Sequence, residues 1–402
     1  MQPSVDPLWS SLVDVCSQGA ALWLVPGALS LALMGATLVV ARREARALVR
    51  VTPGPLEGAL TILIPARDEA ERIGATLDAL LADPSPTLRI LVYDDRSTDD
   101  TRALVEARMG RDARLVLIDG SADPPPVYCG KPAALARALE HADAAELPTR
   151  ERVLFLDADV VLAPGALGGI VRALEESGAR ALSGLPRLVV HSLSEVLLVP
   201  AFVGLAARRY PPSKVHEAHS PVAFLNGQLI LIERAALDEV GGFGSVEDSI
   251  LEDVALAARL KGRGHALRLA DLRAVAETRM YSTVGDILEG FGKNAVPLQG
   301  GLWATAVVGL LSFALSLGAP LTLLGSFAVA PGPCAFVGGL LFGLVLLAQM
   351  RARRTLEVPA WPAWLAPLSY AVVAFVFVRS ALRVATKGEV RWRGRRYPAG
   401  RR

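Results

Sequence analysis

Three long stretches without a charged residue constrain this chain more than any other feature of its sequence. They cover residues 15–41, 294–350 and 358–378. A helix that crosses a bilayer needs about 20 consecutive apolar residues, so these stretches have room for about four membrane segments. We place the segments near residues 18–40, 302–329, 333–350 and 360–378. The helix-breaking sequence APGPC at 330–334 separates the second from the third. We therefore expect a membrane protein with a water-soluble domain after its first segment.

The charges around the first segment predict its orientation. Asp6 and Asp14 precede it without any Lys or Arg, which is unlike a cleaved signal peptide. Four arginines follow it within ARREARALVR at 41–50. By the positive-inside rule the soluble domain faces the cytoplasm, as in a multi-pass protein of the inner (cytoplasmic) membrane. The net charge of +2 gives no reason to expect a nucleic-acid partner, and three cysteines at no metal-binding spacing suit a reducing compartment.

The charges near the C-terminus do not agree with four full crossings. Both RARR at 351–354 and the tail from Arg379 onward, which holds nine Lys or Arg and one Glu, favour the cytoplasmic side. Four crossings would place the tail outside. We therefore expect the last segment, which begins with PAWPAWLAP at 359–367, to be re-entrant or interfacial. The basic tail at 381–402 is expected to contact anionic headgroups.

Short apolar runs alternate with helical patterns in the soluble part of the chain. The runs at 59–66, 88–95, 113–120 and 152–159 indicate strands, and the segments at 69–83, 98–110 and 131–142 indicate helices. This order predicts an α/β fold in which helices cover both faces of a parallel sheet. Ligands bind beyond the carboxyl ends of such strands. Candidate ligand-binding residues lie at the ends of three of the four runs: Pro65, Arg67 and Glu69 at the first, Asp94 and Asp95 at the second, and Asp157 and Asp159 at the fourth.

Two acidic residues one position apart end the fourth run, within VLFLDADVVLAP at 153–164. Asp157 and Asp159 point to the same side of an extended segment, where like charges repel and are costly to bury. They are either a solvated turn or the ligands of a divalent cation. Lys131 follows Gly130 at a helix start, which favours an anion such as phosphate. The alternative for Lys131 is a solvated residue in an ordinary turn.

Six motifs in this order resemble family 2 glycosyltransferases with the GT-A fold. They are LIPARDEAERI, VYDDRSTDDT, CGKPAALARAL, FLDADVVLAP, FLNGQLILIERAALDEVGGF and ILEDVALAARLKGRGHAL. Residues 197–215, 279–295 and 388–398 are similar to the membrane-bound hopene-associated and carotenoid-type members, which act on lipids. The resemblance implies a Rossmann-like nucleotide-diphospho-sugar transferase domain. The implied organisation is a transmembrane anchor and basic linker at 1–56, the GT-A domain at 57–285, an interfacial helix with membrane segments at 286–380, and the basic tail at 381–402.

The resemblance also implies the chemistry on the donor side. It predicts an inverting glycosyltransferase of hexosyltransferase type that uses a nucleotide-sugar donor, with a UDP-sugar as first choice, and Mg²⁺ or Mn²⁺. Hard carboxylate oxygens are the ligands such cations prefer. Asp159 would bind the metal, and Asp157 the metal or the ribose. The remaining donor-binding residues implied are Asp94 and Asp95 for the nucleobase, Pro65, Arg67 and Glu69 around it, and Lys131 for the base or diphosphate.

On the acceptor side, the resemblance implies that Asp253 is the general base and that Glu252 orients it. The alternative for Asp253 is a plain helix-start residue. Asn226 and Gly227 would line the acceptor entrance. Lys293 would contact the diphosphate, or else snorkel at the membrane surface.

Processive members carry Gln-x-x-Arg-Trp, which is missing here, so we expect transfer of a single sugar. The expected acceptor is a membrane lipid, hopanoid or carotenoid-like. The alternatives are a polysaccharide or polyprenyl-phosphate sugar transferase and a non-catalytic membrane scaffold.

Overall fold

A computed structural model describes residues 20–123, 130–147, 151–329, 333–392 and 395–398. The chain divides into two compact units. The helical unit comprises Met1–Arg43, Val190–Ala206 and Thr283–Lys387. The α/β unit comprises Glu44–Val189, Ala207–Ser282 and Gly388–Arg402.

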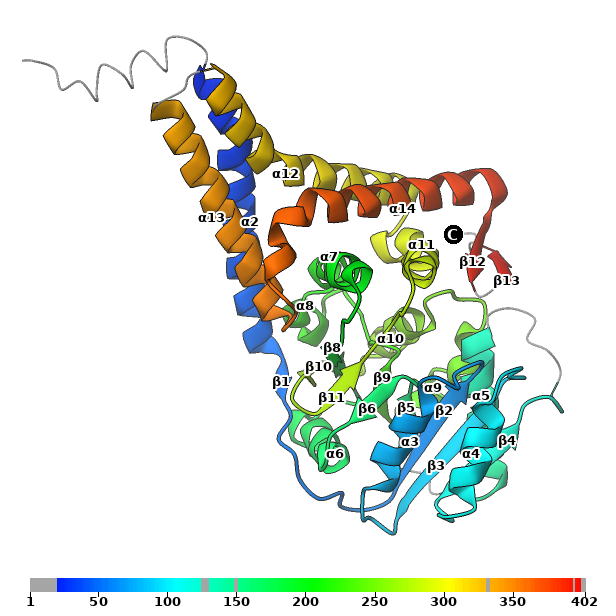
Figure 1. Ribbon diagram of the computed structural model, residues 1–402. Coiled ribbons are helices and arrows are strands. Elements are labelled where there is room, and N and C mark those ends of the chain that lie inside the picture. The colour runs from blue at the N-terminus through cyan, green and yellow to red at the C-terminus, as the bar shows by residue number, and fades with distance from the viewer. Residues whose placement is uncertain (1–19, 124–129, 148–150, 330–332, 393–394, 399–402) are drawn as a thin grey trace, which may run out of the picture. The chain divides into compact units, whose positions relative to one another are not determined.

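The α/β unit is built on an eight-stranded sheet with the order β1-β10-β7-β9-β5-β2-β3-β4 (Figure 1). Its strands are β1 (Val49–Arg50), β2 (Leu60–Ala66), β3 (Leu88–Asp94), β4 (Leu115–Asp119), β5 (Arg152–Leu156), β7 (Ala181–Leu185), β9 (Leu229–Glu233) and β10 (Leu267–Asp271). The four predicted strands form the parallel set β5-β2-β3-β4, as expected. β9 runs antiparallel to both β5 and β7, so the complete sheet is mixed.

Helices and small sheets complete this unit. The helices are α3 (Ile73–Leu81), α4 (Thr101–Met109), α5 (Gly130–Ala144), α6 (Ala166–Ser177), α8 (Pro212–His216), α9 (Arg234–Glu239), η2 (Phe243–Val246) and α10 (Glu252–Gly262). A second sheet contains β6 (Val160–Leu162), β8 (Arg187–Leu188) and β11 (Ala276–Thr278), and β12 (Glu389–Trp392) pairs with β13 (Arg395–Pro398). The predicted helices correspond to α3, α4 and α5.

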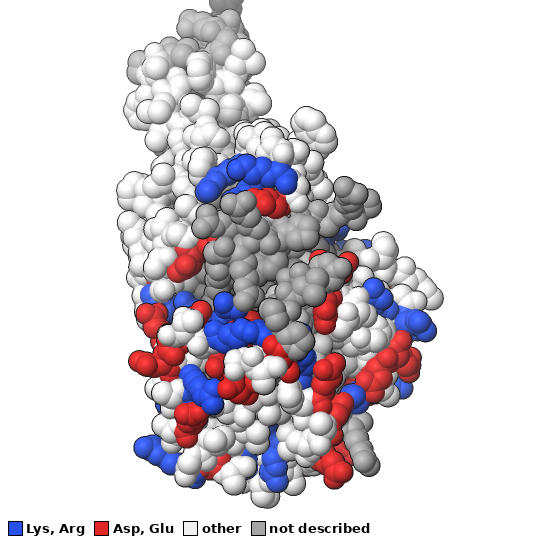
Figure 2. All heavy atoms as spheres, turned by 90° about the vertical axis from the view of Figure 1, so that its right-hand side faces the viewer, with Lys and Arg blue, Asp and Glu red and all other residues white. Residues whose placement is uncertain are grey.

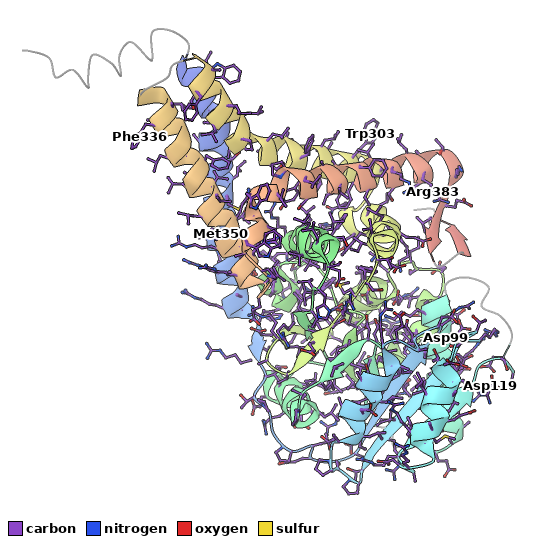
Figure 3. The ribbon with its side chains drawn as sticks, in the orientation of Figure 1. Asp99, Asp119, Trp303, Phe336, Met350 and Arg383 are labelled. Carbon is purple, nitrogen blue, oxygen red and sulfur yellow. The ribbon has the colours of Figure 1, made fainter. Side chains whose placement is uncertain are left out.

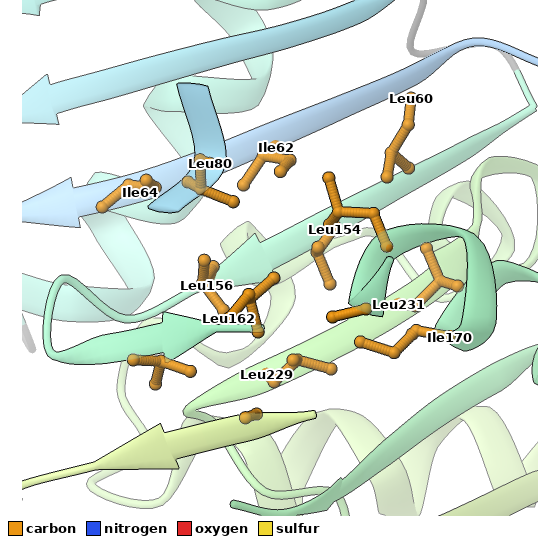
Figure 4. Packing of buried hydrophobic residues seen from close by; sticks show 14 of the residues in the cluster. Leu60, Ile62, Ile64, Leu80, Leu154, Leu156, Leu162, Ile170, Leu229 and Leu231 are labelled. Atoms are coloured by element: carbon orange, nitrogen blue, oxygen red, sulfur yellow. The ribbon is translucent and has the colours of Figure 1, made fainter. Parts of the chain in front are cut away.

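Strands β2, β3 and β5 are almost continuous apolar runs because both faces of the sheet are covered. Leu60, Ile62 and Ile64 of β2 lie in one cluster with Leu154 of β5 and Ile170 of α6 (Figure 4). Each such side chain contributes about 1.5–3 kcal/mol when it is fully buried. This core holds the strands in register, and the polar segments that follow β2, β3 and β5 therefore lie at one edge of the sheet.

The helical unit contains the long apolar helices of the chain. Its elements are η1 (Ala20–Leu24), α2 (Val25–Ala47), α7 (Leu193–Arg209), α11 (Val284–Gln299), α12 (Leu302–Val329), α13 (Pro333–Thr355), η3 (Trp361–Leu365) and α14 (Ala366–Lys387). The C-terminal residues of α2 and α7 belong to the α/β unit. Among the residues that the structure describes, four segments are long and apolar enough to span a membrane: Leu22–Ala47, Leu302–Ala328, Ala335–Thr355 and Trp361–Lys387. The expected set of apolar helices, one N-terminal and three C-terminal, is therefore confirmed. Charged side chains are concentrated elsewhere, over the α/β unit (Figure 2).

Helix α7 packs among other helices of its unit. Phe202 stacks on Phe291 of α11 with 4.2 Å between ring centroids, and its centroid lies 5.8 Å from that of Phe377 of α14. The guanidinium of Arg353 on α13 donates a hydrogen bond to the carbonyl oxygen of Val196, at 2.5 Å. These contacts bury the apolar face of α7 between helices.

His216, at the end of α8, fixes that helix to the sheet. Its Nε2 accepts a hydrogen bond from the backbone N–H of Leu269 in β10, at 2.7 Å. Burial and the nearby Arg268 lower the pKa of His216 to about 4. The imidazole is therefore a neutral acceptor at neutral pH.

Replacing His216 with Ala leaves the Leu269 N–H without its acceptor, at a cost of about 1–3 kcal/mol. Because the pKa is lower in the folded protein than in the unfolded chain, the stabilisation is present above about pH 6.5 and is lost as the pH falls toward about 4. We expect His216→Ala to lower the thermal unfolding midpoint of the detergent-solubilised protein at about pH 8, and the gap to narrow at about pH 5. Exposed His219, changed to Ala, is the control. A gap independent of pH would contradict this account of His216.

Candidate active site

The turn after β5 presents two carboxylates from a fixed backbone. The N–H of Asp157 donates to the carbonyl oxygen of Gln228 at 2.9 Å, and the Thr76 hydroxyl donates to the carbonyl oxygen of Ala158 at 2.8 Å. Ala158 is buried, whereas Asp157 and Asp159 on either side of it are partly exposed. The N–H of Val160 donates to the carbonyl oxygen of Asp157 at 3.2 Å, so a turn carries both carboxylates where the sequence predicted an extended segment.

Lys131, the second residue of α5, joins carboxylates from two distant parts of the sequence. Its Nζ lies 2.6 Å from Oδ1 of Asp157 and 3.5 Å from Oε1 of Glu252, and it donates to the carbonyl oxygen of Gly227 at 3.1 Å. Burial acts to lower the pKa of Lys131, but Asp157 and Glu252 outweigh it and raise that pKa above its ordinary value. Lys131 is therefore a charged bridge, not the solvated turn residue that the sequence left open.

Asp253 lies in the first turn of α10 and is held by two backbone donors. Its Oδ2 accepts from the N–H of Gly227 and its Oδ1 from the N–H of Val254, both at 2.8 Å. A Cβ atom at position 227 would lie 2.9 Å from Oδ2 of Asp253, so this approach requires glycine. Burial and then Glu252 raise the pKa of Asp253 to about 6. A carboxylate with a pKa near neutrality is suited to general-base work.

Asp159 has a side-chain oxygen that accepts no hydrogen bond from a described group. Its Oδ1 is buried and without a hydrogen-bond partner among the described residues. Burial, then Asp157 and then Glu69, raise the pKa of Asp159 to about 7. A buried acceptor beside other carboxylates has the chemistry of a divalent-cation ligand. The described residues contain no preformed group of three His, Cys, Asp or Glu side chains for a metal, so a cation here would take further oxygen atoms from water or from a ligand such as a diphosphate.

Asp95 lies between two arginines at the end of β3. Arg67 Nη1 is 3.4 Å from Oδ2, and Arg96 Nη1 is 2.5 Å from Oδ1. Arg96 was not among the residues predicted from the sequence. Its φ of 60° places it in the left-handed region that favours glycine, and such conformations cluster at functional sites. Nothing in its sequence context indicates this conformation.

Hydrogen bonds join the loops after β2 and β3. They run from the Asp68 N–H to Ser97 Oγ (3.0 Å), from the Thr98 N–H to Asp68 Oδ1 (2.7 Å), from the Glu69 N–H to Thr101 Oγ1 (2.8 Å) and from the Ala70 N–H to Asp99 Oδ2 (3.0 Å). Asp94 takes part in the same structure, because its Oδ1 accepts from the N–H of Ser97 at 3.1 Å. The surroundings of Asp95 are thus held in place by two loops that hydrogen-bond to each other.

The other predicted residues lie in varied surroundings. Pro65 is half-buried near the end of β2, and Glu69 pairs with Arg72 at 3.2 Å. Asn226 turns its Nδ2 to the carbonyl oxygen of Gly184 at 2.8 Å, so its side chain holds the ends of strands. Lys293 lies on α11 of the helical unit and is not part of the unit that carries the carboxylate cluster.

Arg72 is a second residue that the sequence analysis missed. Its positive charge acts to lower the pKa of Asp159, against burial and the neighbouring carboxylates.

Comparison with known proteins agrees with this architecture. The family model described as glycosyltransferase like family 2 matches residues 57–285, more than half of the chain. A 4,4'-diaponeurosporenoate glycosyltransferase of Staphylococcus aureus (strain USA300) is 24% identical over 359 residues, which cover 84% of this chain and 88% of the relative. A mannosyltransferase from Pyrobaculum calidifontis, solved in complex with GDP-Man and Mn²⁺, aligns with a TM-score of 0.50 at 19% identity, covering 90% of this chain and 99% of that one. This structural likeness supports the expected GT-A fold.

Replacing Asp159 with Asn is expected to stabilise the donor-free protein at high pH. The folded protein holds the Asp159 proton up to about pH 7, well above the unfolded value of about 3.9. The contribution of this group to stability is therefore present at low pH and is lost as the pH rises from about 4 toward 7. In EDTA, Asp159→Asn should match the wild-type thermal unfolding midpoint at about pH 5 and exceed it at about pH 8.

The exposed Glu176, changed to Gln, is the matched control and should show no such gain. An Asp159→Asn protein that is less stable than wild type at the higher pH would show that the buried carboxylate is satisfied by other groups.

Proposed function

The chain belongs to glycosyltransferase like family 2, and we propose that it moves a single sugar from a nucleotide-sugar donor to a membrane lipid. One observation carries the proposal. Lys131 brings together the Asp157–Asp159 turn and the Glu252–Asp253 helix start, the donor-side and acceptor-side carboxylates of the predicted mechanism. In the proposed orientation, the α/β unit lies on the cytoplasmic side of the inner membrane.

We assign nucleobase recognition to Asp95. A carboxylate flanked by the guanidinium groups of Arg67 and Arg96 offers an acceptor between donors. Uracil and guanine both present an N–H beside a carbonyl oxygen, which is the complementary pattern. A UDP-sugar is the proposed donor. GDP-Man is the ligand named for the structurally similar Pyrobaculum enzyme.

Asp159, with Asp157, would hold Mg²⁺ or Mn²⁺. The partnerless Oδ1 of Asp159 supports this assignment. When bound, such a cation neutralises the negative charge that develops on a leaving nucleoside diphosphate. In the donor-free protein, the positive charge of Lys131 offsets the repulsion between the carboxylates of Asp157 and Glu252. The same positive charge would stabilise the anionic leaving group.

Asp253 is the proposed general base. It would accept the proton of the acceptor group as that group attacks the anomeric carbon. A single displacement assisted in this way inverts the anomeric configuration. The two backbone N–H donors from Gly227 and Val254 hold the carboxylate in place while it does so.

The lipid acceptor is proposed from two findings. Four helices of the described part of the chain are long and apolar enough to span a membrane, and such helices would keep the enzyme beside its lipid acceptor. The curated relative is named for its action on diaponeurosporenoate, a carotenoid-type compound. A hopanoid or carotenoid-like lipid is therefore the proposed acceptor class.

The test is the release of nucleoside diphosphate from a panel of sugar nucleotides by purified protein with membrane lipid extract. We expect release with one donor in Mn²⁺ or Mg²⁺, its loss in EDTA, and transfer of the labelled sugar to the organic phase. Asp159→Asn and Asp253→Asn should each lower the rate by at least about 100-fold.

Glu176→Gln serves again as a control for a carboxylate that lies outside the cluster. Donor binding without any transfer to lipid, polyprenyl phosphate or polysaccharide would instead indicate a membrane scaffold. Release that is unaffected by Asp253→Asn would remove that residue from the mechanism.

A further inference from the structure

The chain leaves the α/β unit after Ser282 and returns to it at Gly388. On the face that Figure 2 shows, most Lys, Arg, Asp and Glu side chains gather over the α/β unit, and a folded unit with such a surface stays on one side of a membrane. The segments between these two points must therefore cross an even number of times. Three helices there are long and apolar enough to cross: α12, α13 and α14. At most two of them do so.

We propose that α14 is the one that does not cross, and that it lies in the plane of the membrane with an exposed apolar stripe against the acyl chains of one leaflet. This inference rests on the division into units and on the packing of the helical unit, and it does not depend on the donor or the acceptor.

Helix α12 contacts both α2 and α13 through small residues. The Gly27 N–H of α2 donates to Thr322 Oγ1 of α12 at 2.7 Å. Ser30 Oγ donates to the carbonyl oxygen of Leu315 at 2.9 Å. A Cβ atom on Gly338 of α13 would lie 2.1 Å from Ser326 Oγ. Contacts through small residues that bring backbones close together are typical of helices within a bilayer.

Helix α14 packs against a different part of α12. A Cβ atom on Gly309, near the start of α12, would lie 3.0 Å from the Cβ of Phe377. On its other neighbour, Ser380 Oγ donates to the carbonyl oxygen of Gly292 in α11 at 2.6 Å. α11 is not among the spans found in the described residues. Figure 1 shows α14 running across the direction of α2 and α13, and α12 changing direction between its two sets of contacts.

Burial also distinguishes α14 from the crossing helices. Of its most apolar window, 39% is buried within the protein, against 28% for α12 and 22% for α13. A helix that is surrounded by lipid exposes most of its surface. A smaller share of the α14 surface is exposed than of the α12 or α13 surface.

The exposed side chains of α14 and of η3 before it form one apolar stripe. They are Trp361, Trp364, Leu368, Phe375 and Leu382, each more than half exposed. Their spacings of three, four, seven and seven place them on one helical face. Tryptophan favours the membrane–water interface. Trp303 of α12, which is 85% exposed, points outward from the same helix pair (Figure 3).

The positions of basic residues also support an in-plane α14. Three clusters follow the apolar helices: Arg42, Arg43 and Arg46 at the end of α2, Arg351, Arg353 and Arg354 at the end of α13, and Arg379, Arg383 and Lys387 at the end of α14. If α14 lies in the plane, all three clusters are on the side of the α/β unit, as the positive-inside rule requires. If it crosses, the third cluster is on the wrong side. The in-plane arrangement also resolves the conflict that the C-terminal charges raise.

Cysteine labelling in oriented membrane vesicles tests whether the two ends of α14 lie on the same side of the membrane. The three native cysteines are first removed from the full chain. Single cysteines are then introduced one at a time as Glu357→Cys, Thr386→Cys and Ala328→Cys, the last of these near the C-terminal end of α12. All three positions are exposed. We expect a membrane-impermeant maleimide to label Glu357→Cys and Thr386→Cys in the same vesicle orientation, and Ala328→Cys only in the opposite one. Labelling of Thr386→Cys together with Ala328→Cys would overturn the proposal.

Should the cysteine-free chain not accumulate, a protease site appended after Arg402 of the unaltered chain reports the same side. Cleavage is expected only where the α/β unit is accessible. Cleavage from the other side would overturn the proposal.

The depth of spin labels in the bilayer tests whether the apolar stripe of α14 lies parallel to the membrane plane. Nitroxides at Leu368, Phe375 and Leu382, in phosphatidylethanolamine–phosphatidylglycerol liposomes, should report one common depth from their collisions with oxygen and a nickel chelate. Phe336, Leu340 and Leu347 are exposed positions on α13 and serve as the matched control. Their depths should change steadily along about 16 Å of helix. A steady change over the about 21 Å from Leu368 to Leu382 would show that α14 crosses.

Discussion

The ammonium of Lys131 holds together carboxylates that would otherwise repel one another. It lies between Asp157, at the end of β5, and Glu252, at the start of α10. These segments are almost a hundred residues apart, and the sheet alone does not bring their side chains into contact. One half-buried cation therefore makes a dense acidic cluster possible in the donor-free protein. It leaves one oxygen of Asp159 without a partner, and that oxygen is where the account places the metal.

The backbone around this cluster approaches one carboxylate closely at a glycine, and hydrogen bonds hold its loops in place. Gly227 admits the carboxylate of Asp253 to within hydrogen-bond distance of its N–H. The loops after β2 and β3 hold each other through side-chain-to-backbone bonds, and they carry the left-handed residues Asp68 and Arg96. Both loops depend on β2 and β3 pairing in parallel over their full length. The left-handed backbone of Asp68 and Arg96 is thus supported by two long strands that are almost fully buried.

Sequence patterns predicted much of this arrangement. Apolar runs that end in polar residues located β2, β3 and β5, and parallel pairing brings those ends to one edge. The direction of β9 was not predictable, because a short apolar run has the same pattern in a parallel and an antiparallel strand. Nor was the orientation of Asn226, which turns to the backbone of Gly184. Arg96 escaped prediction because its role depends on a φ angle that its neighbours in sequence do not indicate.

The most direct test of the account is the binding of Mn²⁺ by purified protein, followed as loss of the free-ion signal in electron paramagnetic resonance, with and without nucleoside diphosphate. The account predicts tight binding only when the nucleotide is present, because the protein offers Asp159 and Asp157 but few other ligands. It also predicts that Asp159→Asn abolishes this binding. Equal binding by wild type and Asp159→Asn in the presence of nucleotide would contradict the central claim that the partnerless carboxylate is the metal ligand.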